Sequence, residues 1–243
     1  MGTLFGALVD GMIAILNGLY NLTAMVGVAS YGLAIILLTC IVKILLYPLN
    51  YKQMQSMLAM QKIQPLLKEI QEKYKKDPQK MQQKMMEIYR EQGINPMSGC
   101  LPLLIQLPII IALYRGLLNL LKSTDPHKLH FLWINNLGES VTHLIQIHAF
   151  KPEDVIFPLL AGLATYWQMR ITPSSSSGGQ ESMQRTMTLM MPPFVVYIST
   201  TLPSGLALYW AVYNILSIVQ QYYINKRLYN YAEEVTGDNA GGH

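Results

Sequence analysis

The chain has 243 residues, of which 51% are hydrophobic and only 13% are charged. A soluble globular domain has about 25% charged residues, so this composition excludes an ordinary soluble domain and indicates a membrane protein. The formal net charge is only +4, and the two cysteines provide no disulfide framework.

The first apolar stretch, residues 4–28, carries a regular set of polar residues. Thr3, Asp10, Asn17 and Asn21 follow one another at spacings of seven, seven and four. On a helix this spacing gives one stripe about 40° wide. A narrow polar stripe on an apolar helix is typical of a helix in the membrane interface. We therefore expect residues 1–28 to form an extracytoplasmic amphipathic helix, with a true span or a signal anchor as the alternative.

The first clear span contains one charged residue, Lys43, in a nearly continuous apolar run from Tyr31 to Leu49. A charge near the centre of a span costs about 2.5–3.5 kcal/mol on insertion scales, and such residues usually face a protein interior or a water-filled cavity. Lys43 is therefore a candidate functional residue. The alternative is a lysine that snorkels, because Leu49 lies six residues away, roughly 9 Å along a helix.

The segment after this span predicts a pair of helices that stand off the membrane. Residues 51–74 are rich in Gln, Lys and Met and contain no Gly. Asp77 and Pro78 predict the N-cap and first position of a second helix, which should run to about Gln92, with Gly93 after its end. The methionines of the whole segment either bind varied apolar partners or pack the two helices against each other. They are Met54, Met57, Met60, Met81, Met85 and Met86.

Four further apolar stretches, at about 101–121, 155–171, 187–202 and 206–223, approach the length of about 20 residues that a span needs. Pro192 and Pro193 predict a kinked or irregular fourth span. We therefore predict an all-α membrane protein with five transmembrane helices. The expected segments are the amphipathic helix 1–28, the first span 29–50, a cytoplasmic helical hairpin 51–98, the second span 99–121, an extracytoplasmic loop 122–153, spans three to five within 154–224, and a cytoplasmic tail 225–243.

The basic residues predict the orientation in the membrane. Thirteen Lys and Arg residues fall in segments that this topology places on one side, against four on the other, and residues 1–30 contain none. Because basic residues are retained in the cytoplasm, we expect the N-terminus outside and the C-terminus in the cytoplasm.

Common catalytic motifs are absent from the sequence. It contains no GxxxxGK[ST], HExxH or GxSxG, and the expected spans hold no Asp, Glu or His. The histidines of the outer loop lack a convincing metal-ligand spacing. We therefore expect no enzyme, no cofactor and no metal site.

Single polar or amphipathic residues occur within the later spans. Gln106, Gln168, Asn214 and Trp210 could bind neighbouring helices to one another. Alternatively, together with Lys43, they could line one wet, half-open groove.

Three blocks of the sequence resemble the YidC/Oxa/Alb family of membrane insertases, in the order that the family has them. They are CIVKILLYPLN at 40–50, GINPMSGCLPLLIQLPIIIALYRGL at 93–117 and LPSGLALYWAVYNILSIVQQYYI at 202–224. The chain looks most like the shorter Gram-positive-type members. The resemblance implies a hydrophilic groove that is open to the cytoplasm and to lipid. It places Lys43 at the position of the family's groove arginine, and Gln106, Gln168 and Trp210 at polar groove positions.

The resemblance also implies a function in the bacterial plasma membrane. We expect an insertase that moves nascent membrane proteins into the lipid bilayer and assists their folding, with the ribosome and the Sec translocon as further partners and no recognition of nucleic-acid sequence. A small-solute transporter or channel and a membrane-complex assembly scaffold are the alternatives. A transporter predicts inverted repeats, and none is visible between spans one to two and four to five.

Overall fold

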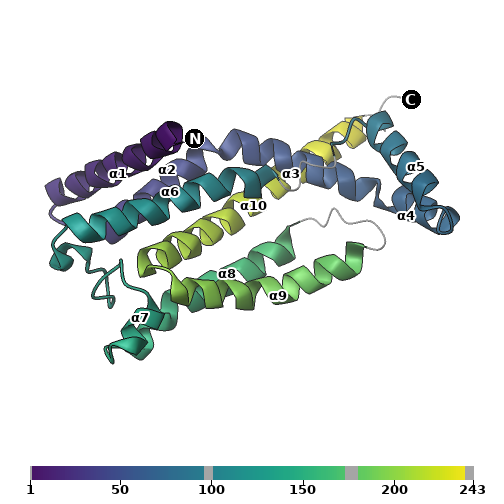
Figure 1. Ribbon diagram of the computed structural model, residues 1–243. Coiled ribbons are helices and arrows are strands. Elements are labelled where there is room, and N and C mark those ends of the chain that lie inside the picture. The colour runs from purple at the N-terminus through teal and green to yellow at the C-terminus, as the bar shows by residue number, and fades with distance from the viewer. Residues whose placement is uncertain (1, 96–100, 173–179, 239–243) are drawn as a thin grey trace.

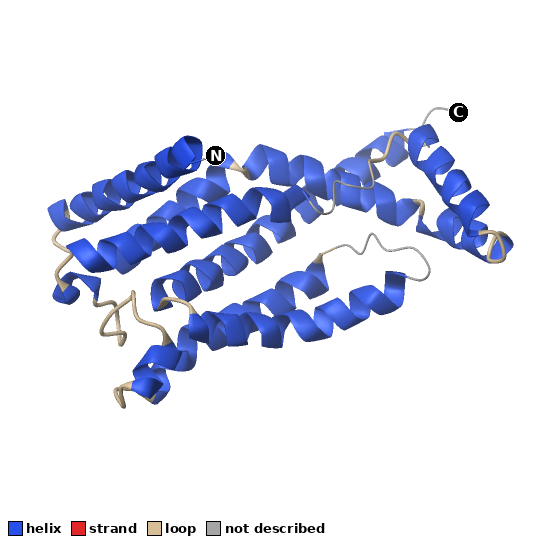
Figure 2. Ribbon diagram, in the orientation of Figure 1, coloured by secondary structure: helices blue, strands red, loops and turns tan. Residues whose placement is uncertain are grey.

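The computed structural model describes residues 2–95, 101–172 and 180–238. Its regular structure is helical throughout this part of the chain (Figure 2), which confirms the predicted all-α class. The α-helices are α1 Gly2–Met25, α2 Tyr31–Leu45, α3 Tyr47–Lys62, α4 Gln64–Lys73, α5 Pro78–Glu91, α6 Leu101–Ser123, α7 Val141–Gln146, α8 Ile156–Ile171, α9 Gln180–Thr201 and α10 Ser204–Asp238.

The long helix α10 lies at the centre of the bundle (Figure 1). It packs against α2 on one side and against α8 on the other, and α9 pairs with α8. Helix α1 packs along α2 and α6. The bundle therefore has two parts, one made of α1, α2 and α6 and the other of α8 and α9, which α10 joins.

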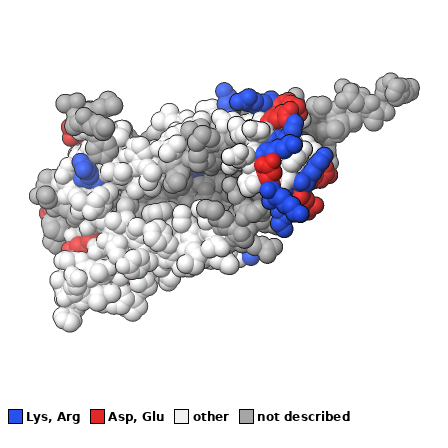
Figure 3. Space-filling view, turned by 45° about the vertical axis from the view of Figure 1, so that its right-hand side comes forward, with Lys and Arg blue, Asp and Glu red and all other residues white. Residues whose placement is uncertain are grey.

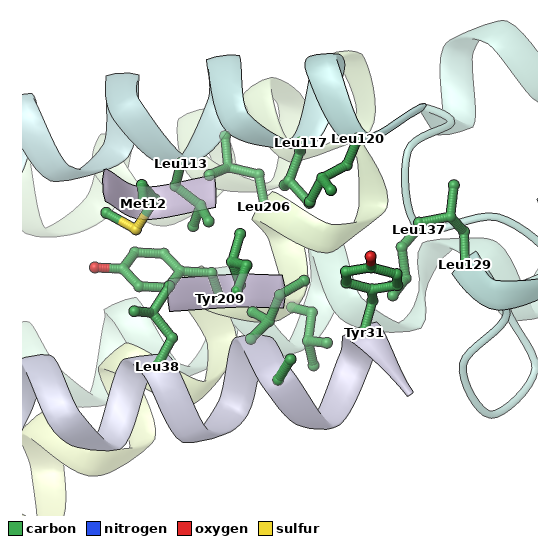
Figure 4. Close-up of a cluster of buried hydrophobic side chains, with 14 of the residues drawn as sticks. Met12, Tyr31, Leu38, Leu113, Leu117, Leu120, Leu129, Leu137, Leu206 and Tyr209 are labelled. Carbon is green, nitrogen blue, oxygen red and sulfur yellow. The ribbon is translucent and has the colours of Figure 1, made fainter. Parts of the chain in front are cut away.

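The main apolar core lies in the first of these parts (Figure 4). It brings together Met12 of α1, Leu38 of α2, Leu113 of α6 and Tyr209 of α10. The outer surface of the bundle is apolar as well, since large side chains on α2, α6, α8, α9 and α10 are exposed. In a membrane protein such side chains face lipid, so this surface fits the class that the composition indicates.

The loop that precedes α7 holds the N-terminal end of α10, next to the C-terminal end of α9. The Ser204 N–H donates to the Glu139 carbonyl over 2.9 Å, and the Gly205 N–H donates to the Leu137 carbonyl over 2.6 Å. The connection between the last two helices is tight, because only Leu202 and Pro203 separate α9 from α10.

A helical hairpin is also present, and α5 covers the range predicted for its second helix. Asp77 caps α5 by accepting a hydrogen bond from the Lys80 N–H at 3.1 Å, and Gly93 adopts a φ of 62° after the helix. However, the first arm is two helices, α3 and α4, separated at Ile63. Pro65, which has no N–H to donate, stands in the first turn of α4 and accounts for this break.

Two expectations about the spans are not confirmed. By length and hydropathy alone, a single described segment qualifies as a span, Gly6–Met25 of α1, and the pair α2 and α3 qualifies only together, across a bend of 58°. A shorter apolar helix covers Leu104–Leu120. The five predicted spans are therefore not confirmed by this criterion, and neither is the interfacial position of α1. The helix α9 continues through Pro192 and Pro193 without a break.

The charges lie mainly at one end of the molecule. Figure 3 shows Lys, Arg, Asp and Glu together at the end that carries the hairpin, while the surface beside it is almost uncharged. Such a separation is expected where the apolar surface lies in the bilayer and the charged end extends from it.

Candidate functional site

Lys43 lies in the last turn of α2, immediately before the bend, and its side chain is only 7% exposed. Its Nζ donates a hydrogen bond to Ser217 Oγ at 2.5 Å and lies 3.6 Å from the centroid of the Tyr213 ring. Both partners belong to α10. The ammonium group therefore binds a neighbouring helix inside the bundle, which is not the geometry of a lysine that snorkels into water.

The hydroxyl of Ser217 is oriented to accept from Lys43. Ser217 Oγ donates its own hydrogen to the Tyr213 carbonyl, one turn earlier in α10, at 2.7 Å. Its lone pairs are therefore left for the ammonium. The ion pairs seen among the described side chains do not include Lys43. A buried ammonium held by a hydroxyl and a ring can still attract an anion, because neither neighbour neutralises its charge.

Gln106 of α6 extends this polar arrangement toward the N-terminal end of α10. Its Nε2 donates to the Tyr209 hydroxyl at 2.8 Å, while its Oε1 is buried without a hydrogen-bond partner. The rings of Tyr209 and Tyr213 lie 5.9 Å apart. Residues of three helices therefore form one continuous row, which we call the polar row: Gln106, Tyr209, Tyr213, Lys43 and Ser217.

The other two predicted groove residues lie toward α8. Gln168 is half-buried on α8, and its backbone carbonyl accepts a hydrogen bond from Thr172 Oγ1 at 2.7 Å. Trp210 is half-buried on α10 and packs against Ala161 of α8 and Val195 of α9. The contacts therefore link Lys43 and Gln106 to the same face of α10, and they do not link Gln168 or Trp210 to Lys43.

A second polar cluster follows the polar row toward the hairpin. Asn50 Nδ2 donates to Gln220 Oε1 at 3.2 Å, and Gln221 bonds to both the Ile171 carbonyl and Thr172 Oγ1 at 3.3 Å. Gln53 is 6% exposed, yet its Nε2 has no partner. A buried donor of this kind is normally satisfied by water or by a bound molecule, so this end of the bundle can accept polar groups.

The contacts add Tyr209, Tyr213 and Ser217 to the residues that the sequence placed in the groove. Together with Gln221, these three residues occur at every fourth position of the last apolar segment. Positions four apart lie on neighbouring parts of one helix face. This periodicity was a usable signal, but tyrosine and serine are common enough in spans that only the contact with Lys43 marks these residues as a site.

Comparisons with known proteins identify the family of the chain. The protein family described as 60Kd inner membrane protein matches residues 21–231 of the chain. The chain belongs to this family. Helicobacter pylori (strain J99) has a membrane protein insertase YidC that is 41% identical over 222 residues, which is 90% of this chain and 36% of that protein. The YidC of Wolinella succinogenes is 44% identical over 201 residues, 82% of this chain and 34% of its own length.

A solved structure supports the fold of this family member. It is described as an active YidC insertase with the first transmembrane domain resolved, and the chain matches it with a TM-score of 0.66 and 30% identity, over 90% of this chain and 46% of that one. The chain thus spans less than half of each of these three proteins. Because they are longer, the expected likeness to the shorter Gram-positive-type members stays a prediction.

Proposed function

We propose that this family member is a membrane protein insertase, which moves segments of nascent membrane proteins into the lipid bilayer. The observation that carries the proposal is the buried cation Lys43, held by α10 in an otherwise apolar bundle. The insertase names of its relatives support the same function. The proposed reaction makes and breaks no covalent bond, so it requires no cofactor.

The proposed mechanism uses the charge of Lys43 to reduce the cost of moving polar groups into the membrane. A short acidic segment of the substrate enters from the cytoplasm and is attracted by the ammonium group. The membrane potential adds about 2.3 kcal/mol per charge and per 100 mV for an acidic residue that moves outward. Burial of about 20 apolar residues in lipid then drives the following segment into the bilayer.

The proposed groove lies between the two parts of the bundle, with Lys43, Gln106, Gln168 and Trp210 along it. The polar row supports the positions of Lys43 and Gln106. For Gln168 and Trp210 the support is weaker, and consists of their half-buried positions on α8 and on the α8 side of α10.

We further propose five spans, formed by α2, α6, α8, α9 and α10, with the C-terminus in the cytoplasm of a bacterial cell. The basic residues of the hairpin support its position on the cytoplasmic side. We retain an extracytoplasmic, interfacial position for residues 1–28. Asp10 is exposed on α1, and in a span its carboxylate would face lipid at considerable cost.

The proposed partners are nascent membrane proteins, the ribosome and the Sec translocon. The hairpin formed by α3, α4 and α5 supports this proposal, because its outer surface is charged and it extends from one end of the bundle (Figures 1 and 3). A segment in that position can meet a nascent chain before the groove does.

The proposed function is tested by insertion of a single-span substrate with an acidic N-terminal tail into vesicles that contain the purified protein. Protease protection of the tail measures insertion. Lys43→Arg should retain insertion, whereas Lys43→Ala should reduce it and Lys43→Glu should reduce it further. Lys52→Glu is the matched control, since Lys52 is exposed on α3. Full insertion by Lys43→Glu would contradict the role of the cation.

The same proteins distinguish the alternative functions in cells that lack this protein. An insertase predicts that single-span substrates remain uninserted, and that wild type but not Lys43→Glu restores them. Loss of a solute flux with normal insertion would indicate a transporter. Loss of a complex whose subunits are all inserted normally would indicate a scaffold.

A further inference from the structure

We propose that Tyr213 and Ser217 are positioning residues, which hold the ammonium of Lys43 in the groove and thereby determine the preference for acidic substrate segments. This inference rests on the proposed insertase function. It assigns a role to two residues of α10 that the resemblance does not place in the groove.

The first step of the argument is the arrangement of donors around Lys43. A lysine ammonium has three N–H donors and no acceptor. One donor is used by Ser217 Oγ, and the ring of Tyr213 lies 3.6 Å away. A ring face attracts a cation without forming a directional bond to each hydrogen. At least one donor therefore remains for a carboxylate of the substrate.

The second step concerns how rigidly the ammonium is held. A lysine has four rotatable side-chain bonds, and its head group can otherwise occupy many positions. Here Ser217 is fixed by its own hydrogen bond to the Tyr213 carbonyl at 2.7 Å, and the Tyr213 ring packs against Tyr209. The two contacts therefore fix the ammonium between α2 and α10, at the level of the polar row.

The third step concerns the charge. Burial in an apolar bundle disfavours a cation unless polar groups replace its water. The described side chains around Lys43 supply a hydroxyl and an aromatic face. No carboxylate among the described side chains forms an ion pair with Lys43. Such a site stabilises the charge without neutralising it, so the charge remains available to an acidic segment. A permanent carboxylate at this place would compete with the substrate.

The test compares paired variants of each residue on two substrates that differ only in the tail, acidic or neutral. Tyr213→Phe keeps the ring and Tyr213→Leu removes it, while Ser217→Thr keeps the hydroxyl and Ser217→Ala removes it. Loss of a desolvated ring contact is expected to lower the ratio of acidic-tail to neutral-tail insertion by about fivefold or more. Tyr213→Phe and Ser217→Thr should keep the wild-type ratio.

A spectroscopic measurement tests the holding of Lys43 without any substrate. In protein with ¹³C-labelled lysine in lipid nanodiscs, the Cε protons of Lys43 should be shifted upfield by the ring current of Tyr213. The signal is assigned with Lys43→Arg. The shift should persist in Tyr213→Phe and disappear in Tyr213→Leu, and Ser217→Ala should broaden it or move it because the ammonium is less fixed.

The outcomes separate the inference from the proposed function. An unshifted Lys43 signal in the wild type overturns the inference. So does a wild-type ratio in folded Tyr213→Leu and Ser217→Ala. If Tyr213→Leu does not fold, the pair Ser217→Thr and Ser217→Ala decides in the same way. A ring-current shift in a protein that inserts neither substrate supports the held lysine and overturns the insertase function instead.

Discussion

Asn214 Nδ2 donates a hydrogen bond to Thr165 Oγ1 over 2.7 Å, and this bond joins α10 to α8. Both residues are buried, and Thr165 Oγ1 donates in turn to the Ala161 carbonyl at 2.7 Å. Asn214 is therefore accounted for by interhelical bonding. Asn214 therefore faces α8 and is not part of the polar row, whose contacts are with α2 and α6.

We predict that Asn214→Ala destabilises the docking of α8 on α10. Its removal leaves the Thr165 hydroxyl with one bond fewer in an apolar setting, and buried interhelical hydrogen bonds contribute about 0.6–2 kcal/mol in membrane proteins. The measurement is the unfolding free energy in bicelles by steric trapping. Thr165→Ser, which keeps the hydroxyl, is the control. Equal losses in both variants would show that packing rather than the hydrogen bond matters.

Gly162 allows α8 and α9 to approach closely. A Cβ atom at this position would overlap the Val196 side chain and lie 3.1 Å from the Pro192 carbonyl oxygen. We predict that Gly162→Ala costs about 1–3 kcal/mol because the two helices must separate. Gly11→Ala is the matched control, since a Cβ there meets nothing within 4 Å. It should be neutral or slightly stabilising. Thermal unfolding in detergent compares the two, and equal midpoints would contradict the close approach.

The hairpin has a small core of its own, separate from that of the bundle. Leu67 is fully buried there, with Met60, Ile63, Ile88 and Tyr89 around it. Two of the methionines, Met60 and Met85, pack within this cluster, whereas Met86 is 45% exposed. Packing of the hairpin on itself thus accounts for part of its methionines.

We predict that Leu67→Ala opens the hairpin and leaves the bundle folded. A buried Leu→Ala change costs about 2–5 kcal/mol, which is large for so small a cluster. Hydrogen exchange should increase over residues 60–92 but not in α2, α8 or α10. Leu66→Ala is the control, because Leu66 is 41% exposed. Faster exchange throughout the protein would show that hairpin and bundle unfold together.

The ion pair between Lys84 and Glu87 on α5 should contribute little to stability. The hydrogen bond to Glu87 raises the pKa of Lys84 above the usual 10.5, but the Lys84 side chain is 44% exposed, so water screens the pair. When the pKa of a lysine is higher in the folded state, the stabilisation is present below the unfolded-state pKa. It is lost as the pH rises through the folded-state pKa. We therefore predict that Lys84→Ala and wild type have the same Tm at neutral pH. A clear difference there would contradict this prediction.

The position of α1 is tested with thiol labelling in a protein whose native cysteines have been replaced. Asp10→Cys and Asn21→Cys should both react with an impermeant reagent added from outside, because both residues are exposed on α1 and residues 1–30 contain no basic residue. Labelling of one position from outside and of the other from the cytoplasm would show that α1 spans the bilayer. Helix α1 packs along α2 and α6, as a spanning helix also would, so labelling from the two sides distinguishes a span from an interfacial helix.

The stripe on α1 shows where a helical pattern alone is insufficient. Asn17, one member of the stripe, accepts a hydrogen bond from the Tyr31 hydroxyl at 2.9 Å and so faces α2. Asp10 and Asn21 are exposed, and the side chain of Thr3 lies outside the described residues. A polar stripe predicts that a helix has a polar face, but water and a neighbouring hydroxyl can satisfy that face equally well.

Local chemistry determined much of this protein in advance. Asp77, Pro78 and Gly93 fixed the bounds of α5, because capping depends on a few neighbouring residues. Apolar composition indicated the class, and the isolated charge of Lys43 marked a site, since a charge in an apolar run is costly wherever the helix lies.

Only the tertiary structure decided what Lys43 contacts. Its partners Tyr213 and Ser217 are 170 or more positions away in the chain, and the hydrogen bond to Ser217 joins residues 174 positions apart. The continuation of α9 through two prolines likewise depends on neighbouring helices. Sequence patterns predict which residues cannot face lipid unaided, whereas the packing of distant helices selects the groups that satisfy them.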